Sequence, residues 1–240
     1  LVLSFAFTFQ AQNFSGKAIY KTNSKSGIKF GKNSKMTDKQ REQMQAKLRK
    51  MNQKTFHLEF NKNESTYKQE AKLNAPSMPT AKGGMMVMSF GSGDNSILYK
   101  NTKKNRFSEK KELMGKVFLI KDDLKKVDWE MTTETKNIGN YTCYKATYTK
   151  EVEDIKMSFI NGESKEEKSM KTVTTTAWYT PQIPINNGPG KYQGLPGLIL
   201  EVNDGRTTIV CTEIELNASE DKEIEEPKKG KVVSLETFTK

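Results

Sequence analysis

The strongest constraint on the fold is a turn signal that leads into an apolar strand. Residues 194–199 read GLPGLI, and the apolar run continues to Val202. A proline pre-sets φ at the second position of a turn, and a glycine supplies the positive φ that a type II turn needs at the third. The segment therefore predicts a type II turn, with Gly197 at positive φ, followed by a strand.

A second turn signal follows and converts this strand into a hairpin. Residues 204–205 read Asp-Gly, which is a strong two-residue hairpin loop. With this loop Asn203 faces Arg206, and Leu198 lies opposite Cys211. Because side chains alternate along a strand, one face should carry these apolar residues: Leu198, Leu200, Val202, Ile209 and Cys211.

Short segments of alternating apolar and polar residues, separated by turn signals, recur along the rest of the chain. Strands are predicted at residues 16–22, 56–60, 65–71, 97–99, 106–113, 117–120, 127–133, 141–150, 172–180 and 232–239. They do not alternate with helical segments, so a parallel sheet is disfavoured. The sequence predicts one mainly β domain over residues 13–240, built as a single curved antiparallel sheet or half-barrel with a helix packed on it.

One helix is predicted, beginning after Thr37. Gln40 stands three residues later and completes a capping box. Met44, Leu48 and Met51 recur at i, i+4 and i+7, which gives a narrow apolar stripe. The other residues of this segment are mostly charged or polar, so the helix should lie on a surface.

The N-terminal residues resemble the end of a secretory signal. Residues 1–9 are apolar and uncharged, and residues 10–12 read Gln-Ala-Gln, as at a cleavage site. The run is too short to span a bilayer, and no other stretch approaches that length. We therefore expect residues 1–12 to be a signal-peptide remnant, the protein to be exported to the periplasm or outer membrane, and no transmembrane segment.

The charge balance is strongly basic, with 40 Lys and Arg against 29 Asp and Glu in 240 residues. Because we expect the protein to be exported from the cytoplasm, we do not expect it to bind nucleic acid. The basic residues are mostly lysines spread over every segment, with few arginines to grip phosphates. A solvated lysine-rich surface and a surface that attracts anionic lipid or acidic glycan both fit this pattern.

Catalytic and metal-binding residue sets are not evident. His57 is the one histidine and falls on the polar side of its strand, which excludes a multi-histidine metal site and disfavours a Ser-His-Asp triad. We predict no enzyme activity, no cofactor and no metal. Cys143 and Cys211 fall in strands of an exported chain, where a disulfide and two buried thiols are both open.

A long loop over residues 72–95 is rich in Met, Gly and Pro. Its apolar residues are Met78, Met85, Met86, Met88 and Phe90. Three interpretations are open: a flexible apolar flap over a ligand or partner, ordinary packing, and thioether ligands for copper(I). A charged segment at residues 151–170 suggests an exposed hairpin tip or an insertion.

The Pro/Gly-rich stretch also has two interpretations: a rigid turn that starts a strand, and a fixed lip beside a binding site. The residues of this candidate lip are Trp178, Tyr179, Gly188, Pro189, Tyr192, Gly194, Leu195, Pro196, Gly197, Leu198 and Ile199. Amphipathic aromatic rings at a rim suit recognition of sugar, peptide or lipid. They equally suit capping of the open end of a sheet.

Ordered sequence blocks across residues 129–202 resemble one protein family. These blocks are Trp129, residues 137–139 (NIG), 141–147 (YTCYKAT), 177–180 (AWYT), 183–184 (IP), 188–189 (GP) and 194–200 (GLPGLIL). Together they are similar to the GLPGLI family of exported Bacteroidetes proteins, whose activity is not established. Gly190-Lys191-Tyr192 departs from the family, in which a bulky apolar residue often follows the Gly-Pro pair.

The resemblance implies an antiparallel-sheet protein of the cell envelope. Such proteins often accompany genes for TonB-dependent outer-membrane receptors, and the half-barrel of periplasmic lipoprotein carriers is a fold-level analogue. We therefore expect a non-enzymatic envelope protein that binds a lipid or other hydrophobic ligand, or an outer-membrane receptor protein. The alternatives are a scaffold with a solid core and, last, a carboxylate-based hydrolase.

Overall fold

The computed structural model of the chain describes residues 14–24, 37–71, 96–160, 163–217 and 223–239. The expected signal remnant at residues 1–12 and the methionine-rich loop at 72–95 lie outside the described residues. The side chains of Met44, Leu48 and Met51, which form the expected stripe of the helix, also lie outside them.

The described residues form a single sheet of twelve strands. The strands are β1 (Ser15–Ser24), β2 (Lys54–Asn61), β3 (Glu64–Gln69), β4 (Ile97–Asn101), β5 (Arg106–Leu113), β6 (Lys116–Asp123), β7 (Glu130–Ile138), β8 (Tyr141–Ile160), β9 (Glu163–Thr180), β10 (Leu198–Asn203), β11 (Thr207–Leu216) and β12 (Lys231–Val233). Their order in the sheet is β12-β6-β5-β4-β3-β2-β1-β11-β10-β9-β8-β7. All neighbours are antiparallel except β12, which pairs in parallel with β6. The mainly β prediction with one open, curved sheet is confirmed.

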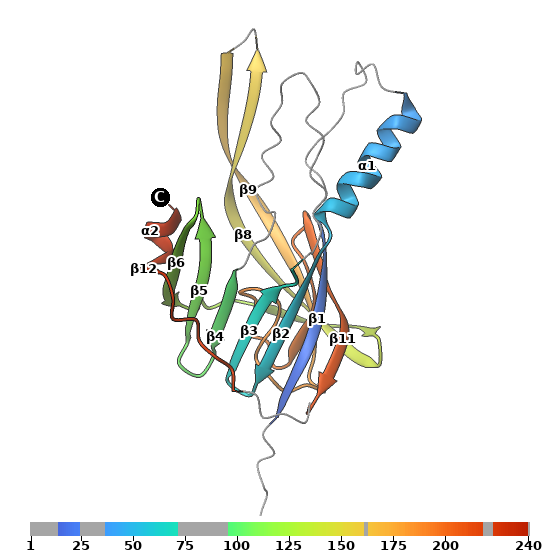
Figure 1. Cartoon of the computed structure of the whole chain (residues 1–240). Helices are drawn as coiled ribbons and strands as arrows, with labels where there is room; N and C mark the ends of the chain where they lie inside the picture. The colour runs from blue at the N-terminus through green and yellow to red at the C-terminus, as the bar shows by residue number, and fades with distance from the viewer. Residues whose placement is uncertain (1–13, 25–36, 72–95, 161–162, 218–222, 240) are drawn as a thin grey trace, which may run out of the picture.

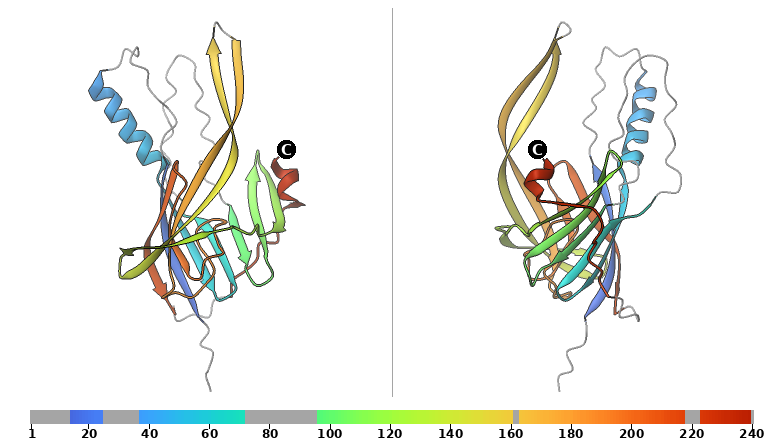
Figure 2. Two further views of the ribbon diagram at one scale, coloured as in Figure 1. Left: turned by 180° about the vertical axis from the view of Figure 1, so that it is seen from behind. Right: turned by 60° about the vertical axis from the view of Figure 1, so that its left-hand side comes forward.

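The connection between β6 and β7 requires the sheet to curl. These strands are consecutive in the chain but lie ten strand spacings apart in the sheet, about 48 Å if the sheet were flat. Residues 124–129 join them, and a segment of this length reaches at most about 25 Å. The sheet therefore bends into a half-barrel, with this connection running across it (Figures 1 and 2).

Two helices accompany the sheet, α1 (Asp38–Asn52) and α2 (Leu235–Thr239). The predicted capping box of α1 is present, with the Thr37 N–H donating to Gln40 Oε1 at 2.9 Å and the Gln40 N–H donating to Thr37 Oγ1 at 3.3 Å. Helix α1 contacts β1 and projects beyond the end of the sheet (Figure 1). The expected last strand is wrong beyond Val233, because Ser234 caps α2 through the Thr237 N–H at 3.1 Å.

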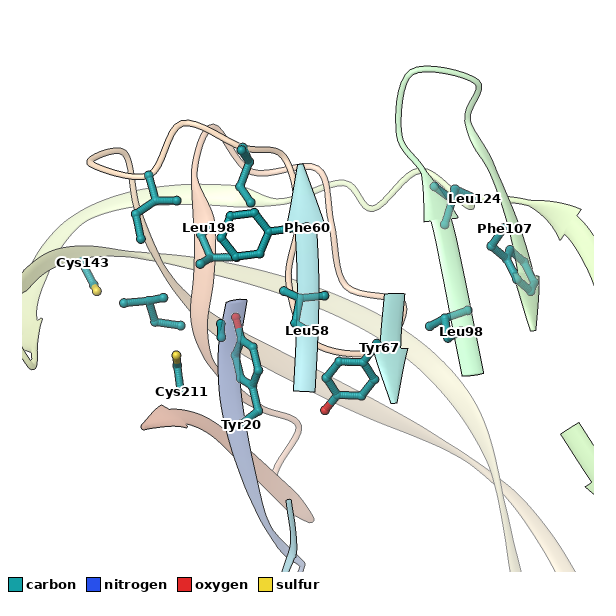
Figure 3. Packing of buried hydrophobic residues seen from close by; sticks show 14 of the residues in the cluster. Tyr20, Leu58, Phe60, Tyr67, Leu98, Phe107, Leu124, Cys143, Leu198 and Cys211 are labelled. Carbon is teal, nitrogen blue, oxygen red and sulfur yellow. The ribbon is translucent and has the colours of Figure 1, made fainter. Parts of the chain in front are cut away.

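The main core lies between the inner face of the curled sheet and the connection from β9 to β10. Its buried members include Tyr20, Leu58, Phe60, Tyr67, Leu98, Phe107, Ile120, Leu124, Ile183, Ile185, Leu198 and Leu200, several of which are labelled in Figure 3. Fully buried Tyr20 donates its hydroxyl proton to the carbonyl of Ile199 at 2.8 Å. The segment before β10 contributes Ile183 and Ile185 to the core, and β10 itself accepts the hydrogen bond of the buried Tyr20 hydroxyl.

A second, smaller cluster lies on the other side of β10. Its buried members are Ala146, Ala177, Tyr179, Leu195, Ile199 and Val202, and Trp129 and Tyr192 pack against it. Neighbouring residues of one strand therefore enter different clusters, as Leu198 and Ile199 do. Strand β10 is buried from both sides.

Candidate functional site

The segment between β9 and β10, residues 181–197, is called the inner loop here. Ile183, Ile185 and Leu195 are almost completely buried. The backbone of the loop pairs with its own end: the Leu198 N–H donates to Ile183 O at 2.9 Å, and the Ile199 N–H donates to Asn187 O at 3.0 Å. These bonds join the inner loop to the first residues of β10 and satisfy buried backbone groups of both.

The predicted turn at residues 195–198 is wrong in type. The Gly197 N–H donates to Leu195 O at 2.8 Å, so the bond closes a three-residue γ-turn around Pro196, whose fixed φ suits that turn. Positive φ occurs at Gly194 (φ 102°) and Gly190 (φ 56°), and not at Gly197. Glycine is needed at 197 for a different reason, because a Cβ there would collide with the carbonyl of Thr180.

The predicted hairpin register is also wrong, by two residues. Asn203 pairs with Thr208, and Val202 pairs with Ile209. The carboxylate of Asp204 accepts the Arg206 N–H at 2.9 Å and the Thr207 N–H at 2.6 Å. This side-chain capping stabilises a four-residue loop in place of the expected two-residue one.

A β-bulge changes the predicted faces of the hairpin. The pairing of β10 with β9 shifts between Ile199 and Glu201. Leu198, Leu200 and Cys211 therefore share the main core as predicted, but Val202 joins the smaller cluster. A bulge adds one residue to a strand and reverses the alternation beyond it.

A buried lysine holds the inner loop from the opposite side of the half-barrel. Lys100 on β4 is fully buried, and its Nζ donates to Gly188 O at 2.8 Å and to Tyr192 O at 3.2 Å. Burial lowers the pKa of Lys100 from 10.5 to about 7. The sequence prediction missed this residue; the available signal was its alternation with Leu98, which places Lys100 on the inner face.

The turn at residues 189–192, next to Lys100, also contacts β5. Within this turn the Tyr192 N–H donates to Pro189 O at 3.2 Å. The Nζ of Lys191 lies 4.1 Å from the ring centroid of Phe107 and 3.3 Å from Oε2 of Glu109. The inner loop is therefore attached to β4 and β5 by charge as well as by apolar packing.

Trp129, just before β7, fastens the other end of this turn. Its Nε1 donates to Gln193 O at 2.9 Å, and the Gln193 side chain donates to Lys125 O at 3.2 Å. The ring centroids of Tyr148 and Tyr192 lie 6.0 Å and 6.4 Å from Trp129. We call Trp129, Tyr148 and Tyr192 the aromatic cluster.

The candidate lip is thus mainly part of the interior. Its buried members are Tyr179, Gly188, Pro189, Leu195, Gly197, Leu198 and Ile199. Gly194 and Pro196 are exposed, and Trp178 and Tyr192 are half-buried. Trp178 packs against the main core with the Lys136 Nζ 4.4 Å from its ring centroid, whereas Tyr192 joins the aromatic cluster on the other side. The contacts show a packing role for the lip, and binding there stays a prediction.

Both cysteines are buried and are free thiols in the structure. The Cys143 thiol donates to Tyr141 O at 3.7 Å and the Cys211 thiol to Glu213 O at 3.4 Å. Burial raises the pKa of Cys143 to about 11 and that of Cys211 to about 12, which suppresses thiolate reactivity. Their strands are separated by β9 and β10. The alternative of a disulfide stays a prediction.

The titratable groups of the outer face form a separate network. Glu226 accepts two hydrogen bonds from Arg106 at 2.8 and 2.7 Å and one from Ser108 at 2.5 Å. The hydrogen bonds from Arg106, foremost, lower the pKa of Glu226 to about 2. The network fastens the segment before β12 to β5.

The remaining candidates for chemistry are few within the described ranges. His57 Nε2 lies 3.9 Å from a carboxylate oxygen of Glu70. In the part of the chain that the structure describes, no group of three or more His, Cys, Asp or Glu side chains could hold a metal ion. Among the same residues, no helix is both long and apolar enough to cross a bilayer.

The hairpin of β8 and β9 extends far beyond the sheet. Strand β7 pairs with β8 only as far as Thr147, and β10 pairs with β9 only as far as Thr176. Residues 148–160 and 163–175 pair with each other, and among the described residues no third strand joins them. We call this two-stranded extension the ribbon; it projects from the same end of the sheet as α1 (Figures 1 and 2). The expected charged segment at 151–170 falls within it.

The comparisons with known proteins match this arrangement in part. No curated protein sequence is significantly similar to the chain. Residues 129–201 match a family described as protein of unknown function (Porph_ging). That range runs from Trp129 through the ribbon and the inner loop into β10.

Two crystal structures of PNGF-II, in the C2 and P21 space groups, are similar in fold. Both are 15% identical in sequence, with TM-scores of 0.52 and 0.53. Each match covers 94% of this chain but 32% of the PNGF-II chain, so the chain spans about a third of the length of those structures. The chain is therefore similar over residues 129–201 to a family of unknown function, and it shares its β fold with part of PNGF-II.

Proposed function

We propose that this chain is a non-enzymatic cell-envelope protein that binds a protein partner through the ribbon. The observation that carries the proposal is the length of β8 and β9, 20 and 18 residues, of which more than half lies beyond the last supporting strand. An isolated two-stranded hairpin is at best marginally stable in water. A partner that packs on the ribbon would supply the missing support.

The filled half-barrel also favours a protein partner over a small ligand at the lip. The inner loop occupies the inner face with Ile183 and Ile185, and Lys100 and Trp129 fasten it in place. A ligand at this position would have to displace buried, hydrogen-bonded chain. The ribbon, in contrast, offers exposed side chains such as Met170, which is 65% exposed.

A hydrophobic ligand remains the second candidate function. Phe56, Ile209 and Trp178 pack against the main core but are only partly buried. Partly covered apolar side chains at the margin of a core can contact a lipid chain. Mass spectrometry of organic extracts of the purified protein tests this candidate, and a stoichiometric lipid would support it.

The pKa of Glu226, a described carboxylate with a clear shift, does not support the hydrolase alternative. The pKa of Glu226 is lowered to about 2, whereas a general acid in glycoside hydrolysis needs a raised pKa. Export, GLPGLI family membership and an outer-membrane receptor partner belong to the same proposal, and they depend on the sequence resemblance.

Site-specific photocrosslinking in native envelopes tests the proposed function. A photoreactive residue replaces exposed Thr172 on the ribbon, and the control carries it at exposed Lys103, in the turn between β4 and β5. We expect a discrete protein adduct from position 172 and none of the same mass from position 103. The absence of an adduct at 172, or the same adducts from both positions, would contradict a ribbon-bound partner.

A further inference from the structure

We propose that the outer edge of β9 between Met170 and Thr175 binds an extended segment of the partner as an added β-strand. The inference rests on the proposed function, since it specifies how the ribbon would bind a protein. Backbone hydrogen bonds give affinity in this mode of recognition, and alternate side chains give specificity.

The position of β10 defines where the added strand would lie. β10 pairs with β9 from Thr180 to Thr176 and ends at Asn203, where the four-residue loop turns the chain back. Within the described residues, the edge of β9 beyond Thr176 has no strand beside it. An added strand would therefore continue the line of β10 and end against the loop at Asp204.

The two edges of the ribbon differ in chemistry, and the difference selects β9. Between Met170 and Thr175 the edge of β9 carries one charged residue, Lys171, and four β-branched residues that favour pairing, at positions 172–175. The opposite stretch of β8, residues 148–153, carries three charged residues, Lys150, Glu151 and Glu153. Charged side chains on an edge strand oppose the addition of another strand.

The aromatic cluster supplies a contact for side chains of the added strand. Tyr148 pairs with Thr175, so both lie on the same face of the ribbon as Val173. The pKa of Tyr192 is raised by burial and, secondarily, by Asp204, and the nearby Thr175 side chain lowers it. The cluster therefore lies beside the start of the edge, at the end of β10. Partner residues next to the cluster should be apolar or aromatic. Farther along the edge, the same face carries Lys150 and Lys171.

The opposite face of the same edge is exposed and mainly polar, with Met170 at its far end. Thr172 and Thr174 are exposed, and the Thr174 hydroxyl lies 3.0 Å from that of Thr149 on β8. Partner residues on this face should be polar, since they would remain in water. The occupant is thus an extended protein segment that alternates apolar and polar residues.

Thr149 and Thr174 provide a matched pair of variants. They are directly opposite each other, and each contributes to the same hydroxyl–hydroxyl hydrogen bond. Thr174→Lys places a charge on the β9 edge, and Thr149→Lys places the same charge on the β8 edge. Both variants lose the same bond, so any difference in binding reports which edge is used.

The probe is a displayed library of random peptides of about seven residues, a common strand length. We expect selected peptides to alternate apolar and polar residues, to bind about tenfold more weakly to Thr174→Lys, and to bind Thr149→Lys nearly unchanged. When the peptide is bound, hydrogen exchange should slow at those amides of residues 170–175 that point away from β8. Equal weakening by both variants, or slowed exchange only elsewhere, would overturn the inference.

Three further outcomes would also overturn it. They are the absence of enriched peptides, protection in the free monomer of those amides of residues 170–175 that point away from β8, and a dimer in sedimentation that Thr174→Lys disrupts. The second means that this chain covers its own edge, and the third assigns the edge to a second copy. If Thr172 crosslinks a protein in envelopes but Thr174→Lys leaves that adduct unchanged, the proposed function stands and only the added strand fails.

Discussion

The buried amine of Lys100 should make the stability of the fold depend on pH. Burial lowers its pKa from 10.5 to about 7, whereas the unfolded chain has the ordinary value. Between these two values the unfolded chain binds a proton that the folded chain has released. The free energy of unfolding should therefore rise as the pH increases from about 7 to about 10.

The structure also sets the magnitude of this effect. One pKa unit corresponds to about 1.4 kcal/mol, so the full shift represents on the order of 5 kcal/mol at alkaline pH. The neighbouring groups do not offset the effect of burial on the Lys100 amine. Ser65, which pairs with Lys100 from β3, is neutral. Lys191 and Glu109 supply one charge of each sign, 3.3 Å apart.

The test compares the parent protein with Lys100→Met. Methionine keeps most of the side-chain length and removes the titrating group. It also leaves the carbonyls of Gly188 and Tyr192 without this donor, at a cost of about 1–3 kcal/mol each. We expect the variant to be clearly less stable at about pH 10, and this deficit to shrink by several kcal/mol towards about pH 6.

Urea unfolding followed by circular dichroism at each pH measures the free energies. Lys191→Met is the control, because Lys191 lies on the same turn but is exposed; it should keep the pH dependence of the parent. Parallel stability curves for the parent and Lys100→Met would refute the lowered pKa of Lys100. A decrease in parental stability from about pH 7 to about pH 10 that Lys100→Met abolishes would show that the sign of the argument is wrong.

Four other substitutions test the packing of the inner loop and of the segment before β12. Gly197→Ala should lower the free energy of unfolding by about 2–4 kcal/mol, because its Cβ meets the Thr180 backbone; Gly190→Ala, which has open space but positive φ, should cost only about 1–2 kcal/mol. Equal losses in urea unfolding would contradict the steric argument. Trp129→Phe removes the hydrogen bond to Gln193 and should cost about 1 kcal/mol in the same assay, with little change counting against that bond. The pKa of Glu226 is lowered to about 2, so its contribution is present above about pH 4.5 and is lost as the pH falls towards 2. In Glu226→Gln, the free energy of unfolding should therefore fall less between about pH 4.5 and about pH 2 than it does in the parent. An unchanged fall would show that the Glu226–Arg106 ion pair does not contribute to stability.

Local patterns were sufficient for much of the secondary structure. Alternation predicted the strands around Phe56–Phe60 and Tyr141–Lys150, and Thr37 with Gln40 predicted the start of α1. These features depend on neighbouring residues, since strand periodicity and capping act over a few positions. The mainly β class follows from them directly.

The hairpin after the inner loop shows where local rules fail. Glycine at 197 suggested positive φ, but the residue is required by the approach of Thr180, which is distant in the sequence. The Asp-Gly loop suggested a register that the Asp204 carboxylate and the β10 bulge displace. Both errors arise because several local solutions have similar energy, and tertiary contacts choose among them.

The strand order and the position of Lys100 belong to the tertiary structure alone. Nothing near residue 100 in the chain indicates that its amine meets the carbonyls of Gly188 and Tyr192. The short β6–β7 connection forces the sheet to curl, and the curl brings β4 to the inner loop. The sequence by itself thus determines which segments become strands and where α1 begins. Only the curled tertiary structure decides which groups are buried together, because burial depends on contacts between residues far apart in the chain.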